Sequence, residues 1–232
     1  MLQELFEDIG GKFISTIEDI NTKNNQIKAY LFDWVGVFNN GEKSGNEGSP
    51  FNEADSMGTN LLRFSYWLKN DNLPIVGILS GEKNQNAINW SNRESIHSCY
   101  FKCGNKSIAF EHFLKNNHLK ASEVAYFFDD VLDLKVAELV GLRIFLPRKN
   151  NPLFNQFVIR KELADYCCST HGGDFAIREA VELLIALNNN FDEVITNRMN
   201  YSTEYKNYIN LRNSGMVEYY SLINQEISRM EI

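Results

Sequence analysis

The sequence predicts an α/β protein built on a doubly wound, parallel sheet. Short apolar runs recur along the chain, as expected for strands that are buried on both faces. Amphipathic segments of helical period fall between these runs. Alternation of strand and helix at this spacing is typical of parallel sheets, in which ligands bind at the carboxyl ends of the strands.

Five strands are predicted, and a sixth is weaker. The five are IKAYLF (27–32), IVGIL (75–79), CYF (99–101), VAYFF (124–128) and LRIFL (142–146), and DYCC (165–168) is the weaker candidate. Helices are expected at 58–70, 105–117, 132–141 and 174–189. The last of these is the clearest, because its apolar residues from Ala176 to Leu187 form one stripe.

Two segments lie outside this alternation. Residues 39–52 are rich in Gly, Asn and Ser and predict a loop or a flexible hairpin. Residues 191–232 are expected to form two helical pieces, 202–212 and 216–230, separated near Gly215. The predicted organisation is therefore an N-terminal helical lead-in (1–26), a core (27–190) and a helical C-terminal extension (191–232).

Composition and charge exclude several classes of function. A net charge of -7 argues against a general nucleic-acid binder, which usually carries a basic patch. No apolar run is long enough to span a bilayer, and the acidic N-terminus does not resemble a signal peptide, so a cytoplasmic protein is expected. Cys99 and Cys103 would need two more ligands to hold zinc; like Cys167 and Cys168, they are predicted to be buried thiols.

Polar residues with related chemistry follow four of the predicted strands. Asp33 follows the first, Ser80 and Gly81 the second, Lys106 the third, and the acidic group Asp129, Asp130 and Asp133 the fourth. Each group alone has an ordinary structural explanation, but together they could hold Mg²⁺ between Asp33 and Asp129, with Ser80 and Lys106 on a phosphoryl group. A two-component receiver domain is excluded, because its acidic pair follows the first strand, whereas the pair Asp129-Asp130 follows the fourth strand here.

Five segments of the chain match, in order, the motifs of one family. They are FDWVGVFNNG (32–41), FNEADSMGTNLL (51–62), NKSIAF (105–110), VAYFFDDVLDLKVAELVGL (124–142) and ADYCCSTHGGDFAIREAVELLI (164–185). In these segments the chain resembles the haloacid dehalogenase-like phosphatases, in particular the capless branch that acts on 3-deoxy-manno-octulosonate 8-phosphate and sialic-acid 9-phosphate. The resemblance covers roughly residues 27–190.

The resemblance implies a Rossmann-like core without a cap domain and a role for each matched residue. Asp33 would be the nucleophile, with Ser80, Gly81 and Lys106 binding the phosphoryl group of a small phosphate ester. Mg²⁺ would be held by Asp33, the Val35 carbonyl and Asp129, with Asp133 in support. Family members cover the open site by forming homotetramers through the hairpin after the first motif, so an oligomer, most simply a tetramer, is expected here.

The chain departs from the family pattern at several positions. Val35 stands where the family has the aspartate that serves as general acid and base, a function typically worth about 10²–10⁴-fold in rate. Phe128 replaces a glycine before the metal aspartate and is expected to crowd the site. Glu82, Ala54 and Asp174 stand where close relatives often have arginine, so cationic contacts to a sugar phosphate are expected to be missing.

Two hypotheses from different classes follow. The first is a magnesium-dependent sugar-phosphate phosphatase with impaired or altered activity. The second is a catalytically inactive pseudophosphatase that acts as an oligomerisation or binding module. Dehalogenation is a third and weaker alternative: haloacid dehalogenases also lack the second carboxylate, but they usually carry a helical cap, and only about forty residues separate Asp33 from the second strand here.

Overall fold

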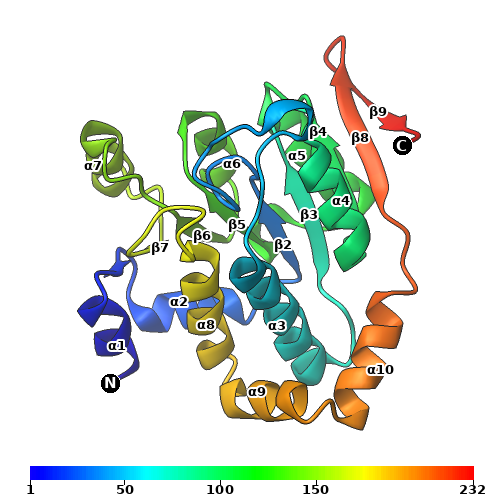
Figure 1. The fold of residues 1–232 in the computed structure, drawn as a ribbon. Coiled ribbons are helices and arrows are strands. Elements are labelled where there is room, and N and C mark those ends of the chain that lie inside the picture. The colour runs from blue at the N-terminus through cyan, green and yellow to red at the C-terminus, as the bar shows by residue number, and fades with distance from the viewer.

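The computed structural model describes residues 1–232 and contains one nine-stranded sheet (Figure 1). The strand order is β1-β7-β6-β5-β2-β3-β4-β8-β9. The seven strands from β7 to β8 in this order are mutually parallel, whereas the edge strands β1 and β9 pair antiparallel with their neighbours. The predicted α/β fold with a mostly parallel sheet is therefore confirmed.

All six predicted strands are present, within a residue or two at most ends. They are β2 (Ala29–Phe32), β3 (Ile75–Leu79), β4 (Ser98–Phe101), β5 (Val124–Phe128), β6 (Leu142–Phe145) and β7 (Tyr166–Cys167). Strand β2 lies between β3 and β5 and is buried along its whole length. The order of strands reverses direction beside β2, and this reversal opens a crevice at the carboxyl end of the strand, where Asp33 follows.

Helices cover both faces of the sheet. One face packs against α2 (Ile17–Asn24), α3 (Glu53–Asn70), α4 (Gln85–Glu94) and α8 (Ala176–Leu187). The other packs against α5 (Lys106–Asn116), α6 (Leu134–Ala137) and α7 (Pro152–Arg160). The four predicted helices correspond to α3, α5, α6 and α8. No helix in the structure is both long and apolar enough to cross a membrane.

Two of these helices were not predicted from the sequence. The polar sequence QNAINWSNRE hides α4, because only Ala87, Ile88 and Trp90 supply its apolar face. Helix α7 begins at Pro152, a residue that suits the first turn of a helix. The N-terminal lead-in also differs from the prediction: between α1 (Leu2–Asp8) and α2, strand β1 (Lys12–Phe13) pairs with β7.

The C-terminal extension is only half helical. It contains α9 (Phe191–Met199), α10 (Thr203–Arg212) and then strands β8 (Glu218–Ile223) and β9 (Glu226–Met230). The prediction of a helix over 216–230 is wrong. Asn224 and Gln225 both have positive φ and form a two-residue turn, and EYYSLI lies along the open edge of β4. Pairing with β4 outweighs the helical pattern because it satisfies the backbone groups of an edge strand.

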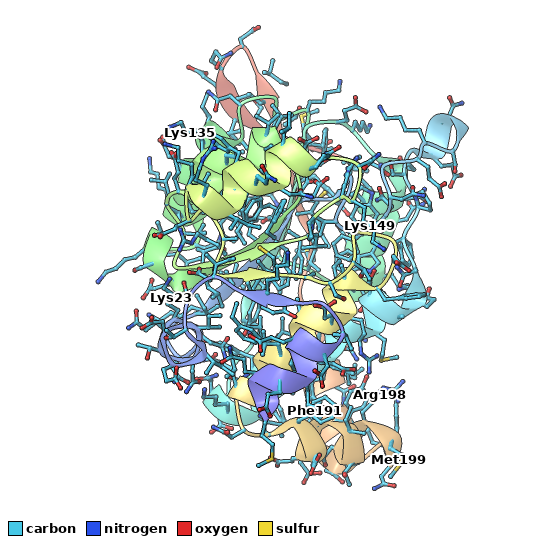
Figure 2. All side chains as sticks on the ribbon, turned by 90° about the vertical axis from the view of Figure 1, so that its left-hand side faces the viewer. Lys23, Lys135, Lys149, Phe191, Arg198 and Met199 are labelled. Atoms are coloured by element: carbon cyan, nitrogen blue, oxygen red, sulfur yellow. The ribbon has the colours of Figure 1, made fainter.

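The helices of the extension pack against α3 of the same chain. Figure 2 shows Phe191, Arg198 and Met199 of α9 together at the lower end of the molecule. Asn60 of α3 is the centre of a buried hydrogen-bond network. Its Nδ2 donates to the Tyr205 hydroxyl (2.8 Å), and its Oδ1 accepts from Tyr208 (3.0 Å) and from Arg212 (2.8 Å). The extension is thus fastened to its own core by polar contacts as well as by aromatic packing.

We expect Asn60→Ala to destabilise the fold, because it leaves the buried Tyr205 hydroxyl without its partner and removes one hydrogen bond each from Tyr208 and Arg212. The free energy of unfolding should fall by about 1–3 kcal/mol in urea denaturation. Asn89→Ala is the matched control, since Asn89 is exposed on α4, and it should change stability by less than about 0.5 kcal/mol. Equal midpoints for the two variants would show that the Asn60 network does not hold the extension.

Candidate active site

The loop after β2 sets the position of Asp33. The Asp33 amide donates to the Phe127 carbonyl, the last bond of the ladder with β5, and the chain then turns through Trp34–Phe38. The indole of Trp34 is fully buried and stacks on Phe38. The side chain of Asn39 closes the turn, because it accepts from the amides of Gly36 and Gly41 and donates to two carbonyls of the same loop.

Gly36 is the point where this loop meets the opposite wall of the site. Its φ is +94°, a conformation that favours glycine. A Cβ at this position would collide with the carboxylate of Asp129 and with the guanidinium of Arg148. The absence of a side chain at Gly36 therefore lets these two groups pack directly against the backbone of the loop after β2.

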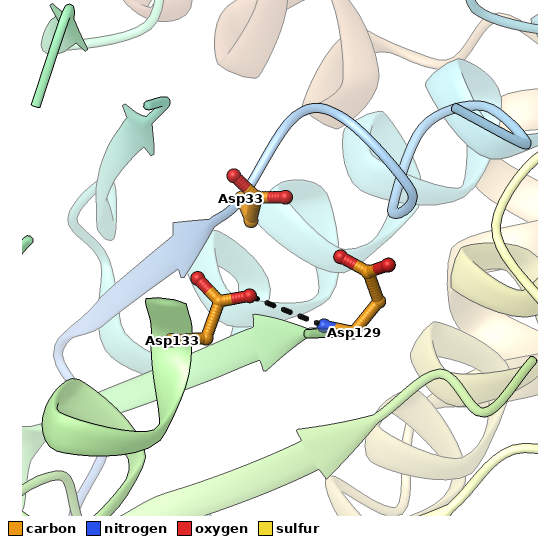
Figure 3. Close-up of side chains that lie close together, drawn as sticks. All are labelled: Asp33, Asp129 and Asp133. Carbon is orange, nitrogen blue, oxygen red and sulfur yellow. Dashed lines mark hydrogen bonds between the residues drawn. The ribbon is translucent and has the colours of Figure 1, made fainter. Parts of the chain in front are cut away.

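Three buried carboxylates lie together at the carboxyl ends of β2 and β5 (Figure 3). One oxygen from each of Asp33, Asp129 and Asp133 lies within 4.8 Å of the others. Asp33 follows β2, Asp129 follows β5, and Asp133 ends the short 3₁₀ turn Val131–Asp133. The structure thus brings together the three acidic side chains that the sequence predicted as metal ligands.

Lys106 is the cation at the centre of this cluster. It is the first residue of α5, which Asn105 caps. Its Nζ lies 2.5 Å from Asp33 Oδ1 and 2.5 Å from Asp133 Oδ1, and its side chain is 3% exposed. Burial opposes the charge on Lys106, but Asp133 and Asp33 more than offset that effect and raise its pKa above the ordinary value.

Asp133 has a full set of hydrogen-bond partners. Its Oδ1 accepts from the Tyr126 hydroxyl (2.5 Å) as well as from Lys106. Its Oδ2 accepts from the backbone amides of Asp130 (3.2 Å) and Asp129 (3.5 Å). A carboxylate held by four donors is well suited to orient its neighbours, and it has little capacity left for direct metal ligation.

Asp129 is in the opposite situation. It is 1% exposed, and neither of its carboxylate oxygens has a hydrogen-bond partner. Its one ionic contact is with Arg148, whose Nη2 lies 2.5 Å from Oδ2. Burial and the carboxylates of Asp33 and Asp133 raise the pKa of Asp129 well above its ordinary value, against the opposing charge of Arg148. Burial likewise raises the pKa of Asp33, to about 6.

These residues fit a divalent cation such as Mg²⁺. All candidate ligand atoms are carboxylate or carbonyl oxygens, which Mg²⁺ prefers. Three carboxylates face two cationic side chains, so the cluster keeps an excess of negative charge. Neither buried oxygen of Asp129 has a hydrogen bond, and Oδ1 has no ionic contact either, a state that costs free energy unless a cation satisfies it.

A cavity of about 270 Å³ opens onto the cluster. Its lining is mostly polar and comprises Asp33, Val35, Gly41, Lys43, Gly81, Glu82, Lys106, Asp129, Asp130, Leu132, Asp133 and Arg148. The predicted residues are therefore gathered around one cavity, with one exception. Ser80 does not line it, and its Oγ accepts from the Glu82 amide at 3.4 Å. A second cavity of about 720 Å³, beside α4 and the β8–β9 hairpin, has no carboxylate cluster.

Two expected obstacles in the site are resolved by the structure. Phe128 does not crowd the cavity: strand alternation turns it into the core on the α5–α6–α7 side, where it packs with Tyr126 and Phe145. Glu82 lines the cavity as expected, but its charge is offset, because Lys43 pairs with it at 2.5 Å. That pair links the 39–52 segment to the loop after β3.

Three residues of the site were missed in the sequence. Arg148 follows β6 by three residues, so the rule of carboxyl strand ends would have found it if applied to the fifth strand as to the first four. Lys43 comes from a segment whose sequence has no regular pattern. Tyr126 lies inside an apolar strand, and nothing in VAYFF indicates that its hydroxyl reaches a carboxylate.

Comparison with known proteins supports the resemblance. No protein-family model matches the chain. The 3-deoxy-D-manno-octulosonate 8-phosphate phosphatase of Salmonella typhi is 29% identical over 178 residues, which cover 75% of this chain and 87% of that protein. The same phosphatase of Escherichia coli K12 is 28% identical over 179 residues, covering 75% and 88%.

Solved structures agree with the sequence relatives. A hydrolase of HAD superfamily subfamily III A from Legionella pneumophila superposes with a TM-score of 0.65 at 25% identity, over 79% of this chain and 96% of that one. The Moraxella catarrhalis octulosonate 8-phosphate phosphatase, solved with magnesium, phosphate and KDO, has a TM-score of 0.66 at 24% identity, over 79% and 99%. The predicted fold is confirmed, and these relatives belong to the branch that the motifs resemble.

The raised pKa values predict how the stability of the metal-free protein depends on pH. A carboxyl whose pKa is raised by folding holds its proton more tightly in the folded state, so the free energy of unfolding falls as pH rises above about 4. For Asp33, this loss of stability continues up to about pH 6, its pKa in the folded protein. Asp129 adds to the loss, because its pKa is raised well above the ordinary value. With chelator present, Asp129→Asn should therefore raise Tm at pH 7.5, by about 2–4 °C per kcal/mol removed, and by less at pH 5.

The matched control for this prediction is Asp130→Asn, since Asp130 is exposed at the start of the same turn. Its Tm should follow that of the wild type at both pH values. A lower Tm for Asp129→Asn at pH 7.5 would show that the pair with Arg148 outweighs the cost of burying the charge.

Proposed function

Because this chain is a relative of the 3-deoxy-D-manno-octulosonate 8-phosphate phosphatases and has the haloacid dehalogenase-like fold, we propose that it is a Mg²⁺-dependent phosphatase-like protein whose turnover is impaired. The proposed substrate class is a small phosphomonoester, and a sugar phosphate such as the one its relatives hydrolyse is the first to test. The proposed site is the cavity that holds Asp33, Lys106, Asp129 and Asp133.

The identity of residue 35 carries this proposal. Val35 lines the cavity two residues after Asp33, and part of its side chain packs against the core. Valine cannot transfer a proton. His171, an alternative proton carrier, does not line the cavity, and its Nδ1 lies 2.8 Å from the Gly172 carbonyl. Glu82 and Asp130 are the other carboxylates of the lining, and Glu82 is paired with Lys43.

The chain's own residues define the proposed mechanism. An oxygen of Asp33 attacks phosphorus, the bond to the ester oxygen breaks, and the sugar leaves as an alkoxide that no residue at position 35 can protonate. Lys106 keeps Asp33 ionised and placed, and it offsets charge on the phosphoryl oxygens together with the backbone at Gly81. Buried Ser80 would act through the loop after β3, because its Oγ accepts from the Glu82 amide. Water then releases phosphate from Asp33, and this step is also slow because no base activates the water.

Asp33, Asp129 and the Val35 carbonyl would hold the magnesium ion, with Asp133 as their orienting neighbour. A bound Mg²⁺ would offset the repulsion between the Asp33 carboxylate and an anionic phosphoryl group. Replacement of the Val35 side chain does not remove its carbonyl, so the change at this position affects proton transfer more than metal binding.

A non-catalytic role is the second candidate. The pair between Arg148 and Asp129 favours it, because that arginine already occupies one side of the proposed metal ligand. In this case the protein would bind a ligand or a partner through the same cavity without turning a substrate over.

The cytoplasmic location and the division of the chain into a lead-in, a core and an extension also stay predictions.

We expect Val35→Asp to increase sugar-phosphate hydrolysis in the presence of Mg²⁺ by about 100-fold or more, since it returns a general acid to the site. Wild type should prefer aryl phosphates, whose leaving groups need no proton. Val35→Asn is the matched control: it has the same shape as aspartate but cannot transfer a proton, so its rate should stay at the wild-type level. Asp129→Ala should abolish the magnesium dependence of Val35→Asp.

A wild-type rate on a sugar phosphate near the usual enzymatic value, about 10 per second, would overturn the impaired-site proposal. Glu82→Gln would then identify the group that moves the proton. No turnover in either protein on aryl or sugar phosphates, with magnesium still bound, would favour the non-catalytic role.

We further propose that the protein assembles as a homo-oligomer, most simply a tetramer. Val131 and Leu132 are adjacent and more than half exposed, and Leu132 lines the cavity, so a neighbouring subunit that covers the cavity would bury them. Light scattering at micromolar concentration should give a multiple of the 26.7 kDa chain mass, and replacing both residues with serine should reduce it. A monomer mass for the wild type contradicts this proposal.

A further inference from the structure

Arg148 is a cation of the site that the matched motifs do not account for. It follows β6 in the loop before α7, and its backbone carbonyl accepts hydrogen bonds from the Asn151 amide (3.0 Å) and from Asn155 Nδ2 (2.8 Å). The backbone is therefore held in place, and the freedom of this residue lies in its side chain. That side chain is 26% exposed and extends over the cavity to Asp129.

The Arg148 guanidinium contacts one of the two Asp129 oxygens that could ligate a divalent cation. Its Nη2 contacts Asp129 Oδ2, and the group lies against the bare backbone of Gly36 and beside Gly41. Asp129 is its one carboxylate partner. Arg148 thus places a single positive charge beside Asp129, the buried carboxylate of the cluster that has no hydrogen bonds.

The other cations of the cavity have different partners. Lys106 is held by two carboxylates, Asp33 and Asp133, and Lys43 is paired with Glu82. Lys106 also contacts a proposed magnesium ligand, Asp33, but it is shared with Asp133, whereas Arg148 has Asp129 as its single carboxylate partner. A divalent ion at Asp129 would therefore displace this arginine in particular and leave a guanidinium with its donors unpaired at the edge of the same cavity.

We propose that Arg148 neutralises Asp129 until a divalent cation replaces it, and that the released guanidinium then binds the phosphoryl group of the substrate. The planar fork of arginine donors matches phosphate oxygens, and it would restore a cationic contact that Glu82, Ala54 and Asp174 do not provide. This inference rests on the proposed magnesium site, and it concerns binding rather than turnover.

The experiment measures two affinities for wild type and Arg148→Gln. Calorimetry with Mg²⁺ alone should show about tenfold tighter binding by the variant, because a competing charge next to Asp129 has gone. Titration with inorganic phosphate at saturating Mg²⁺ should show about tenfold weaker binding by the variant, because an arginine contact to the anion is lost. Arg148→Lys keeps the charge without the fork and should fall between the two proteins in both measurements.

Lys149→Gln is the matched control, since it removes the same charge from the adjacent, exposed residue, and both of its affinities should equal those of the wild type. Unchanged or weaker magnesium binding by Arg148→Gln, including no binding at all, would overturn the exchange. Unchanged phosphate binding would overturn the substrate contact. Both readouts are independent of hydrolysis, so an inactive wild type that shows the exchange would refute the proposed phosphatase activity and not this inference.

Discussion

The arrangement of the site depends on one buried interaction, the bridge that Lys106 forms between Asp33 and Asp133. Two carboxylates this close together, with almost no exposure to water, repel each other and lose hydration. A single ammonium group between them offsets both costs at once. Removing one member of such a buried group typically costs about 3–5 kcal/mol. The loop after β2, the turn after β5 and the start of α5 are therefore fixed with respect to one another by charge as well as by the sheet.

This bridge also divides the roles of the acidic residues. Asp133 spends its acceptors on Lys106, Tyr126 and two backbone amides, so it serves the geometry of the cluster. Asp129 receives no share of Lys106 and is left with buried oxygens that lack hydrogen bonds. Asp129 is therefore the carboxylate that an additional cation would stabilise most, and either Arg148 or a divalent ion can be that cation.

The sequence predicted the parallel sheet and most of the site because both follow from local patterns. Buried parallel strands are continuous apolar runs, and the residues after them must meet at one edge of the sheet, which is how Asp33, Lys106 and Asp129 could be placed together before any coordinates. The β8–β9 hairpin could not be predicted in this way, because its strands are stabilised by the distant edge of β4. The orientation of Phe128 depends on the register of β5 between two neighbours, which a glycine-to-phenylalanine difference does not reveal. Lys43 lies in an irregular segment, and only the contact with Glu82 brings it to the cavity.

In the proposed phosphatase, the effect of Val35 is confined to proton transfer, because the ion pairs of the site are made by other residues. Val35 contributes no charge to the cluster, and none of the ion pairs of Lys106 or Arg148 involves it. An aspartate at this position would join a cavity that already has an excess of negative charge. Neighbouring carboxylates would then raise its pKa, as they do for Asp129, and a carboxyl group that keeps its proton near neutral pH is what a general acid requires. The carboxylates that would raise the pKa of a general acid at position 35 are thus present, although Val35 itself cannot transfer a proton.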